Sequence, residues 1–431
     1  MKVDDLLTNR YRELIPERER VKEEIINDMV MMIGLKGELI CIPNRKEIPS
    51  PIAFLGKKAS GKSLGLHRLA DESFWNWGIC VAIMNDSLEE CFEWCLSQNH
   101  LKWVARIEKL GQIPIPLPTV YVFPMNRDLS IKENPYYPDP KKKDIKGKFV
   151  NYIKISLPFS EFLENLDEYM SLGGSGVYLR NIIDDLKECS NQTEVFEVLN
   201  KVRVDAAKTA VLDKIKANFN NIFREKILFI SNVNCPEYLS VNDYMGNPLV
   251  VLLKAGVVPC FITSNLYMQR YKNQIYAYHI NSIFDAIQKG IIDKTYLIFD
   301  ELTKVCSRED RKQNPAEDAL NQIAARGRMN NIGLAYATQN YAKIPSIIRS
   351  NTEYLFCFRH SSRAEVNEIK NDFSLMELNE DEILKLKKLE CVGITSDFFR
   401  IYNPDGTVEE TSEPVRGTII PPLSRHRLPS K

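Results

Sequence analysis

Short apolar runs alternate with helical segments in the first third of the chain. Ile52–Leu55 is one such run, a helix is expected from Lys62 to a turn at Trp75–Gly78, and Ile79–Met84 is the next run. Continuous apolar runs separated by helices are typical of parallel strands that are buried on both faces of a sheet. The pattern therefore predicts an α/β fold with a central, mostly parallel sheet.

A long helical interval interrupts this alternation before the strands resume. Residues 160–226 place apolar side chains at three-to-four spacing, as in Val211, Ile215 and Phe219. This spacing predicts a large helical insertion within the sheet domain. The other expected elements are strands at Val120–Phe123, Val257–Thr263, Tyr296–Phe299, Leu334–Ala337 and Tyr354–Phe358, and helices at Met268–Lys289 and Ala316–Arg326.

The two ends of the chain have patterns of their own. A loose apolar stripe that includes Leu6, Leu14 and Val21 predicts a helical N-terminal arm. The last residues are basic and rich in proline, so we expect a tail that packs along a neighbouring surface or stays flexible. The predicted division is an arm (1–47), a first core part (48–158), a helical insertion (159–249), a second core part (250–403) and the tail (404–431).

Composition narrows the class of protein. The chain has 431 residues, of which 57 are Lys or Arg and 57 are Asp or Glu. This balance excludes a broadly basic nucleic-acid coat and an acidic disordered chain. The sequence contains no apolar run of the roughly 18–20 residues that a membrane helix needs. We expect a cytoplasmic protein, either free or peripheral to the inner face of a membrane complex.

Cysteine and tryptophan add packing predictions rather than chemistry. The ten cysteines form no C-x-x-C pair, and Cys91, Cys95 and His100 lack an evident fourth zinc ligand, so we expect reduced, buried thiols. Packing in the core or between subunits is the favoured role for the four tryptophans, and base stacking the less favoured one. The lysines of residues 141–148 indicate a solvated loop or a contact with phosphate backbones, and both remain open.

The clearest chemical motif follows the first apolar run. Gly56-Lys57-Lys58-Ala59-Ser60-Gly61-Lys62-Ser63 fits G-x-x-x-x-G-K-[ST] between a strand and a helix, and Leu64 continues the helix. Such a loop turns backbone N–H groups toward phosphates, and the helix N-terminus favours negative charge. Lys62 would bridge phosphate oxygens and Ser63 would bind Mg²⁺.

A second strand ends in two acids. The run Tyr296–Phe299 is followed by Asp300 and Glu301, which is the Walker B pattern. Asp300 would hold Mg²⁺ through water, and Glu301 would act as the general base toward a water molecule. A plain surface acid is the alternative for Glu301.

Beyond these motifs, the sequence resembles a family. Ala324-Ala325-Arg326-Gly327-Arg328-Met329-Asn330-Asn331-Ile332-Gly333-Leu334-Ala335-Tyr336-Ala337-Thr338-Gln339 resembles the HerA/FtsK superfamily of pumping ATPases, as does Phe358-Arg359-His360-Ser361-Ser362. The order of P-loop, helical insertion, Asp-Glu pair, Arg-Gly-Arg and Ala-Thr-Gln is similar too. The resemblance covers residues 48–400 and implies a RecA-like P-loop NTPase.

The resemblance also implies roles for particular residues. Gln339 would sense the terminal phosphate of ATP or position water, and Arg328 would act as an arginine finger toward a neighbouring subunit. A surface salt bridge is the alternative for Arg328. Family members act as hexameric rings with nucleotide between subunits. Arg326, Arg359 and Arg363 are further candidates for the finger.

The leading functional hypothesis is therefore a homo-hexameric ring that hydrolyses ATP, with Mg²⁺, to translocate duplex DNA in chromosome or plasmid transfer or in viral genome packaging. Its partners would include a membrane or capsid-associated transfer complex. The alternative is a type IV secretion or pilus ATPase that powers transfer at a membrane complex. A nucleotide-binding scaffold without turnover is a third hypothesis. The family's β-barrel, membrane helices and winged-helix domain have no counterpart in the sequence pattern.

Overall fold

The structure is a computed structural model that describes a large part of the chain. Within the described residues, 14 strands form a single sheet, and two short strands form a second one. The described residues are 28–44, 48, 51–85, 94, 97–124, 152–155, 157–158, 163, 182–202, 209–224, 228–229, 247–263, 269–308, 314–374 and 379–424.

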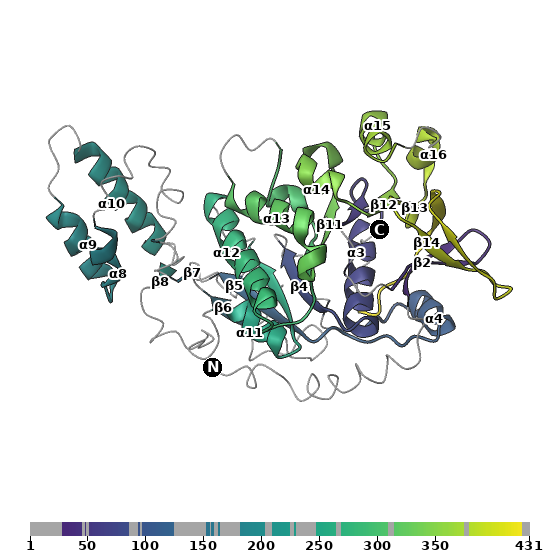
Figure 1. Ribbon diagram of the computed structural model, residues 1–431, viewed down its shortest axis with the longest axis horizontal. Coiled ribbons are helices and arrows are strands. Elements are labelled where there is room, and N and C mark those ends of the chain that lie inside the picture. Colours follow the sequence, from purple (N-terminus) through teal and green to yellow (C-terminus); the bar gives the residue numbers. More distant parts are fainter. Residues whose placement is uncertain are drawn as a thin grey trace.

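One half of the large sheet is parallel (Figure 1). Its central strands are continuous apolar runs buried on both faces, as the sequence pattern predicts. The predicted α/β fold with a mostly parallel core is confirmed. In spatial order, this half contains β12 (Tyr354–Phe358), β3 (Ile52–Leu55), β11 (Ile332–Thr338), β10 (Thr295–Phe299), β4 (Cys80–Asn85), β9 (Val258–Ile262), β5 (Thr119–Pro124) and β6 (Tyr152–Ile155).

Helices cover both faces of the parallel half. Ala53 and Leu55 belong to the core cluster that includes the residues of α11–α13, whereas Ile52 and Phe54 share a cluster with α3. The alternation of neighbouring residues between two helix layers explains why the strand is apolar throughout. These helices are α3 (Lys62–Asp71), which a π-helical turn (Glu72–Asn76) extends, α4 (Leu101–Lys109), α11 (Pro248–Lys254), α12 (Gln269–Gln288) and α13 (Pro315–Arg326).

The other half of the sheet is antiparallel and corrects two predictions. Residues 29–42 form two strands rather than part of a helical arm, and residues 408–419 form two strands rather than a tail. The physical reason is pairing with distant partners, because β1 pairs with β16 and β14 pairs with β2. This half contains β15 (Val408–Thr411), β14 (Phe399–Tyr402), β2 (Leu39–Ile42), β1 (Met29–Gly34), β16 (Val415–Ile419) and β13 (Glu390–Thr395).

The helical insertion is present between the two halves of the core sequence. Figure 1 shows α8 (Ile183–Lys187), α9 (Gln192–Lys201) and α10 (Thr209–Arg224) grouped at the left end of the molecule, away from the large sheet. Val195 and Phe219 are fully buried in this group. The strands β7 (Leu157–Pro158) and β8 (Leu228–Phe229) pair with each other where the insertion leaves and rejoins the core. The exact domain boundaries stay predictions.

The packing predictions hold wherever the residues are described. Trp75, Trp94 and Trp103 are buried, and Trp77 packs against the same core cluster. The described cysteines are buried and form no disulfide with one another. No helix in the described ranges is long and apolar enough to cross a membrane. Residues 1–27, the basic segment 141–148, Cys91, Cys95 and residues 425–431 lie outside the described residues.

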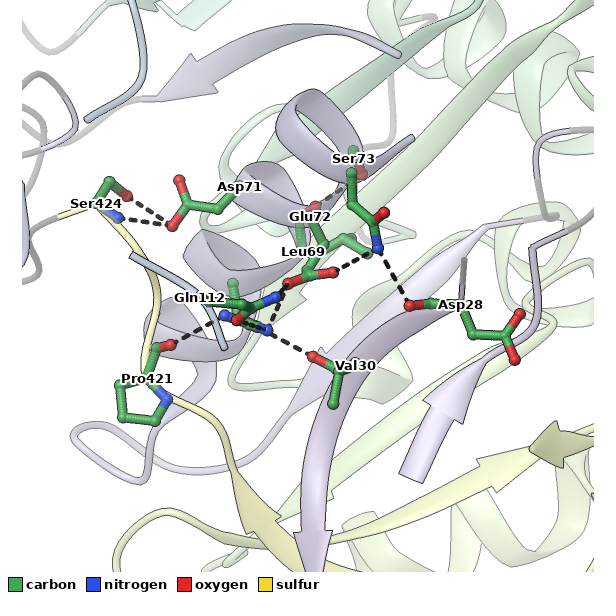
Figure 2. A network of polar contacts seen from close by, with 11 residues as sticks. Asp28, Val30, Leu69, Asp71, Glu72, Ser73, Gln112, Pro421 and Ser424 are labelled. Carbon is green, nitrogen blue, oxygen red and sulfur yellow. Dashed lines mark hydrogen bonds and ion pairs between the residues drawn. The ribbon is translucent and has the colours of Figure 1, made fainter. Parts of the chain in front are cut away.

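A buried polar network joins α3 to both ends of the described chain (Figure 2). Arg68 is fully buried and forms an ion pair with Glu72. Its guanidinium donates to the carbonyl of Val30 at 3.0 Å, to the side chain of Gln112 at 2.7 Å and to the carbonyl of Pro421 at 3.4 Å. Because a buried guanidinium needs acceptors on several sides, this one position holds β1 and the C-terminal segment against α3.

A second set of buried hydrogen bonds joins α3 to the C-terminal segment, one turn further along the helix. Asp71 is fully buried and accepts hydrogen bonds from the backbone N–H of Ser424 at 2.9 Å and from its hydroxyl at 3.0 Å (Figure 2). Burial raises the pKa of Asp71 from 3.8 to about 7, against the opposing effect of the hydrogen bonds from Ser424. The last described residues are therefore part of the layer that supports the helix of the P-loop.

The remaining short helices connect strands at the two edges of the sheet. They are η5 (Leu302–Lys304), η6 (Arg328–Asn330), η7 (Tyr341–Lys343), α14 (Ser346–Ser350), α15 (Arg363–Asp372) and α16 (Glu380–Lys385).

Candidate nucleotide site

The loop Gly56–Ser63 lies where β3 ends and α3 begins, as the motif predicts. Gly56 and Gly61 have φ angles of 146° and 129°, in the region that favours glycine. A Cβ at either position would lie within 2.9 Å of Phe358. Both glycines are therefore required by conformation and by the close approach of β12.

The loop is held from both neighbouring strands. The N–H of Gly56 donates to the carbonyl of Thr338 at 3.4 Å, and the N–H of Lys57 donates to the carbonyl of Arg359 at 2.9 Å. α3 begins at Gly61 without a side-chain cap and without an acid in its first turn. Its positive end is therefore suited to an anion, as in phosphate-binding loops.

Lys62 and Ser63 face the site from the first turn of α3. The Lys62 ammonium is mostly buried and donates to the carbonyl of Lys57 at 3.0 Å, so it lies over the loop. The hydroxyl of Ser63 donates to Oδ1 of Asp300 at 2.9 Å across 237 positions of sequence. The structure thus brings together the two residues that the motifs predict as Mg²⁺ ligands, and a hydroxyl beside a carboxylate is a donor set that suits this ion.

Parallel register brings the acidic pair to the P-loop. Phe299 pairs with Tyr336, and Thr338 pairs with Leu55, so the ends of β10, β11 and β3 meet at one edge. Ligands of α/β proteins bind at this carboxyl edge. Asp300 and Glu301, the first residues after β10, therefore lie where a nucleotide would be held.

Three side chains position Glu301. Its Oε1 accepts hydrogen bonds from the hydroxyls of Thr303 at 2.7 Å and Thr338 at 2.8 Å. Its Oε2 accepts a longer hydrogen bond from the amide of Gln339 at 3.4 Å. The two hydroxyls fix the carboxylate through one oxygen, and the second oxygen remains directed at Gln339.

Thr303 and Thr338 are functional candidates that the motif reasoning misses. Threonine is a common residue in strands and turns, so its presence alone carries no signal. Thr338 sits within the Ala-Thr-Gln strand end, which was the one available signal. The pairing itself depends on β10 and β11 being neighbours.

Arg328 lies at the other edge of the sheet. It stands in η6, before β11 begins, whereas Gln339 follows the end of β11. The seven residues of β11 separate the two edges by roughly 20 Å, at about 3.3 Å per residue. The structure therefore does not bring Arg328 to the P-loop of its own chain.

The surroundings of Arg328 are polar and open. Its guanidinium lies 3.8 Å from the carboxylate of the largely buried Glu353. The exposed side chain of Met329 is next to it in sequence. A hollow of about 300 Å³ at this edge is lined by Arg328, Ser350, Asn351, Thr352, Glu353, Ser396 and Asp397.

The remaining arginine candidates are distributed differently. Arg326 is exposed at the end of α13, on the same side of the sheet as Arg328. Arg363 is exposed and forms an ion pair with Asp381 at 2.8 Å. Arg359 follows β12, beside the P-loop of its own chain.

A turn near the C-terminus also contacts the P-loop. Leu389 has a φ of 73°, an unusual conformation for a residue with a branched side chain. Its N–H donates to the carbonyl of Ser60 at 2.9 Å, and a Cβ at Gly61 would lie 3.2 Å from its side chain. The strained turn therefore braces the loop, and no motif in the sequence indicates it.

The arrangement can bind and cleave a phosphoanhydride. It offers a backbone loop and an ammonium for phosphates, a hydroxyl–carboxylate pair for a divalent ion, and an oriented carboxylate next to an amide for a water molecule. All of these groups belong to one chain and lie at one edge of the sheet. Arg328 lies at the other edge and is not among them.

Comparison with known proteins agrees at the level of fold. No family model matches the sequence, and no curated protein matches it. Among solved structures, VirB4 of Thermoanaerobacter pseudethanolicus is 14% identical, with a TM-score of 0.51 over 91% of this chain and 96% of that chain.

Two further structures are more distant. The bacterial conjugative coupling protein TrwBdeltaN70 is 11% identical, with a TM-score of 0.46 over 95% of this chain and 94% of that chain. B204, the DNA-packaging ATPase from Sulfolobus turreted icosahedral virus, is 12% identical, with a TM-score of 0.30 over 84% of this chain and 97% of that chain. Both TM-scores are too low to carry a conclusion. The chain has the fold of VirB4 over nearly all of its length, with its P-loop, acidic pair and Gln339 together at one edge of the sheet.

Proposed function

We propose that this chain is an ATP-hydrolysing subunit of a ring motor that translocates double-stranded DNA. The observation that carries the hydrolytic part is the joined site, in which Ser63 contacts Asp300 while Glu301 contacts Gln339. A protein that only bound nucleotide would have no need for an oriented carboxylate beside the amide. The site therefore supports turnover over a scaffold role.

Each residue has one chemical task in this proposal. The P-loop N–H groups and Lys62 bind the phosphates of ATP and offset their charge. Glu301, held by Thr303 and Thr338 through Oε1, accepts a proton from the attacking water. Gln339 orients that water, because its amide both donates and accepts.

Ser63 and Asp300 would hold Mg²⁺, which neutralises the charge on the phosphate oxygens when it is bound. Arg328 would complete the site of a neighbouring subunit in a homo-hexamer. Its position at the opposite edge from the P-loop supports this assignment, because an arginine there reaches a nucleotide only across an interface. Its partner Glu353 holds the guanidinium near that edge.

Duplex DNA as the substrate rests on the resemblance of residues 324–339 to the HerA/FtsK superfamily. The zero formal charge is compatible with it, because a ring repeats a few channel cations by symmetry. In the cell, such a motor would work in the cytoplasm, or at the inner face of a membrane or capsid-associated transfer complex.

The test is the ATPase rate of the assembled protein with and without linear duplex DNA. Lys62→Ala and Glu301→Gln each remove one group of the site, so we expect hydrolysis to fall by at least roughly a hundredfold in both. Duplex DNA should increase the wild-type rate. The matched controls are Lys102→Ala and Glu382→Gln, which change exposed residues of α4 and α16 and should hydrolyse ATP like the wild type.

Two results would contradict the proposal in different ways. Undiminished hydrolysis in Lys62→Ala and Glu301→Gln would reject the assigned site. Full hydrolysis without any response to DNA, together with co-purification of membrane components, would instead favour the type IV secretion or pilus ATPase.

A further inference from the structure

Arg359 is fixed beside the P-loop by its own backbone. β12 pairs in parallel with β3, with Cys357 opposite Leu55, and this register places Arg359 next to Lys57. The carbonyl of Arg359 accepts the N–H of Lys57 at 2.9 Å and lies 3.1 Å from where a Cβ of Gly56 would be. The residue therefore cannot move independently of the loop.

The guanidinium of Arg359 has a buried donor, a feature that it shares with Arg349, whose guanidinium also pairs with Glu368 at 3.0 Å. The Nε of Arg359 is buried and has no hydrogen-bond partner among the residues that the structure describes. Arg328 and Arg363 have acidic partners at 3.8 and 2.8 Å. An arginine whose donor is left buried without an acceptor is costly, and a ligand that carries an anion would satisfy it.

The site has two sides, and Arg359 is on the side without the acids. β3 lies between β11 and β12 in the sheet. Glu301 and Gln339 follow β10 and β11, so the terminal phosphate and the attacking water belong on that side. A phosphate chain bound across the P-loop would then place the phosphates closer to the nucleoside on the side of β12.

We propose that Arg359 is a phosphate-binding residue of its own chain, which contacts the phosphates next to the nucleoside rather than the terminal phosphate. The inference rests on the proposed function of the P-loop as a nucleotide site. It separates Arg359 from Arg328, because one acts within the subunit and the other across an interface. A planar guanidinium suits two phosphate oxygens at once.

Calorimetric titration of the full chain with ADP and with a non-hydrolysable ATP analogue, both with Mg²⁺, tests this assignment. Arg359→Gln keeps a polar side chain and removes the charge, and Arg359→Ala removes both. We expect each variant to bind both nucleotides at least roughly tenfold more weakly than the wild type, because a charge-assisted hydrogen bond is lost. The loss of affinity should be similar for ADP and the ATP analogue and independent of protein concentration.

The matched control is Arg106→Ala, which removes an exposed arginine of α4 and should bind both nucleotides with wild-type affinity. A thermal melt shows which variants are folded, and either folded variant decides the result. Wild-type affinity in Arg359→Gln or Arg359→Ala would overturn the inference, and so would a loss confined to the ATP analogue. If the wild type binds neither nucleotide, the proposed function fails and the inference fails with it.

Discussion

At the scale of single residues, the contacts around Glu301 explain how the carboxylate that we propose as the base is held in a defined direction. Thr303 and Thr338 both donate to Oε1, and the amide of Gln339 is next to Oε2. The P-loop and acidic residues could be predicted from sequence because their chemistry resides in neighbouring positions. The two threonines could not, because a contact between β10 and β11 creates their role.

Thr338→Val tests the positioning of Glu301. The substitution keeps the shape of a fully buried side chain and removes the hydroxyl that donates to Oε1 at 2.8 Å. Because Thr303 still donates to the same oxygen, we expect kcat to fall by roughly tenfold while KM for ATP changes little. Steady-state ATPase kinetics measure both constants.

Thr352→Val is the matched control for this prediction. Thr352 is also buried, but its hydroxyl bonds with Tyr336 and with the carbonyl of Ile348, away from Glu301. Thr352→Val should lower the thermal stability of the protein and leave kcat unchanged. A wild-type kcat in Thr338→Val, or an equal loss in Thr352→Val, would argue against the positioning role.

At the scale of elements, α3 is both the helix of the P-loop and the anchor for the two ends of the described chain. Arg68 holds β1 and the carbonyl of Pro421, and Asp71 holds Ser424. The core strands and helices could be predicted because each has its own period. The antiparallel strands could not, because their partners are distant in sequence. Met32 of β1 pairs with Ile419 of β16, which lies 387 positions later in the chain.

The buried carboxyl of Asp71, which accepts hydrogen bonds from Ser424, predicts that the free energy of unfolding depends on pH. Burial raises the pKa of Asp71 to about 7 in the folded protein, from an ordinary value of 3.8. A raised pKa means that the folded state favours the protonated form, so this group stabilises most at low pH. Its contribution is lost as the pH rises from about 4 to about 7, and it is constant above that range.

Asp71→Asn removes the titration and leaves an oxygen that can still accept from Ser424. We expect the free energy of unfolding of the variant, relative to the wild type, to increase by about 2.5 kcal/mol between pH 5 and pH 8. Chemical denaturation at both pH values measures this difference. The exposed Asp318→Asn reports the background pH dependence, and an equal pH response in Asp71→Asn and the wild type would contradict the prediction.

At the scale of the whole molecule, the residues proposed for ATP hydrolysis are divided between the two edges of the sheet. The P-loop edge carries Lys62, Asp300 and Glu301, and the opposite edge carries Arg328 beside Glu353. Under the proposed function, a single subunit would therefore hold both halves of a site, but on different edges. If subunits assemble head to tail, the Arg328 edge of one faces the P-loop edge of the next.

Mixing two inactive variants tests this division. Arg328→Ala keeps its P-loop edge, and Glu301→Gln keeps its arginine edge, so a mixed ring contains interfaces in which both halves are intact. Random mixing of equal amounts should restore about a quarter of the wild-type ATPase rate. Half of the subunits keep Glu301, and half of these face a neighbour that keeps Arg328. The rate is measured after co-assembly.

Each variant alone is the control and should hydrolyse ATP far more slowly than the wild type. A mixture no faster than its components would reject the contribution of Arg328 across an interface. Wild-type hydrolysis in Arg328→Ala alone would assign Arg328 to the salt bridge with Glu353 instead.

The sequence by itself determined the α/β core, the P-loop, the acidic pair and the helical insertion, because local periodicity and adjacent residues encode each of them. Only the tertiary structure decided that residues 29–42 and 408–419 are strands of the same sheet. It also decided that Thr338 holds Glu301, that Leu389 braces the P-loop, and that Arg359 and Arg328 lie at different edges. These features depend on which strands become neighbours, and that order is set by packing rather than by any local pattern.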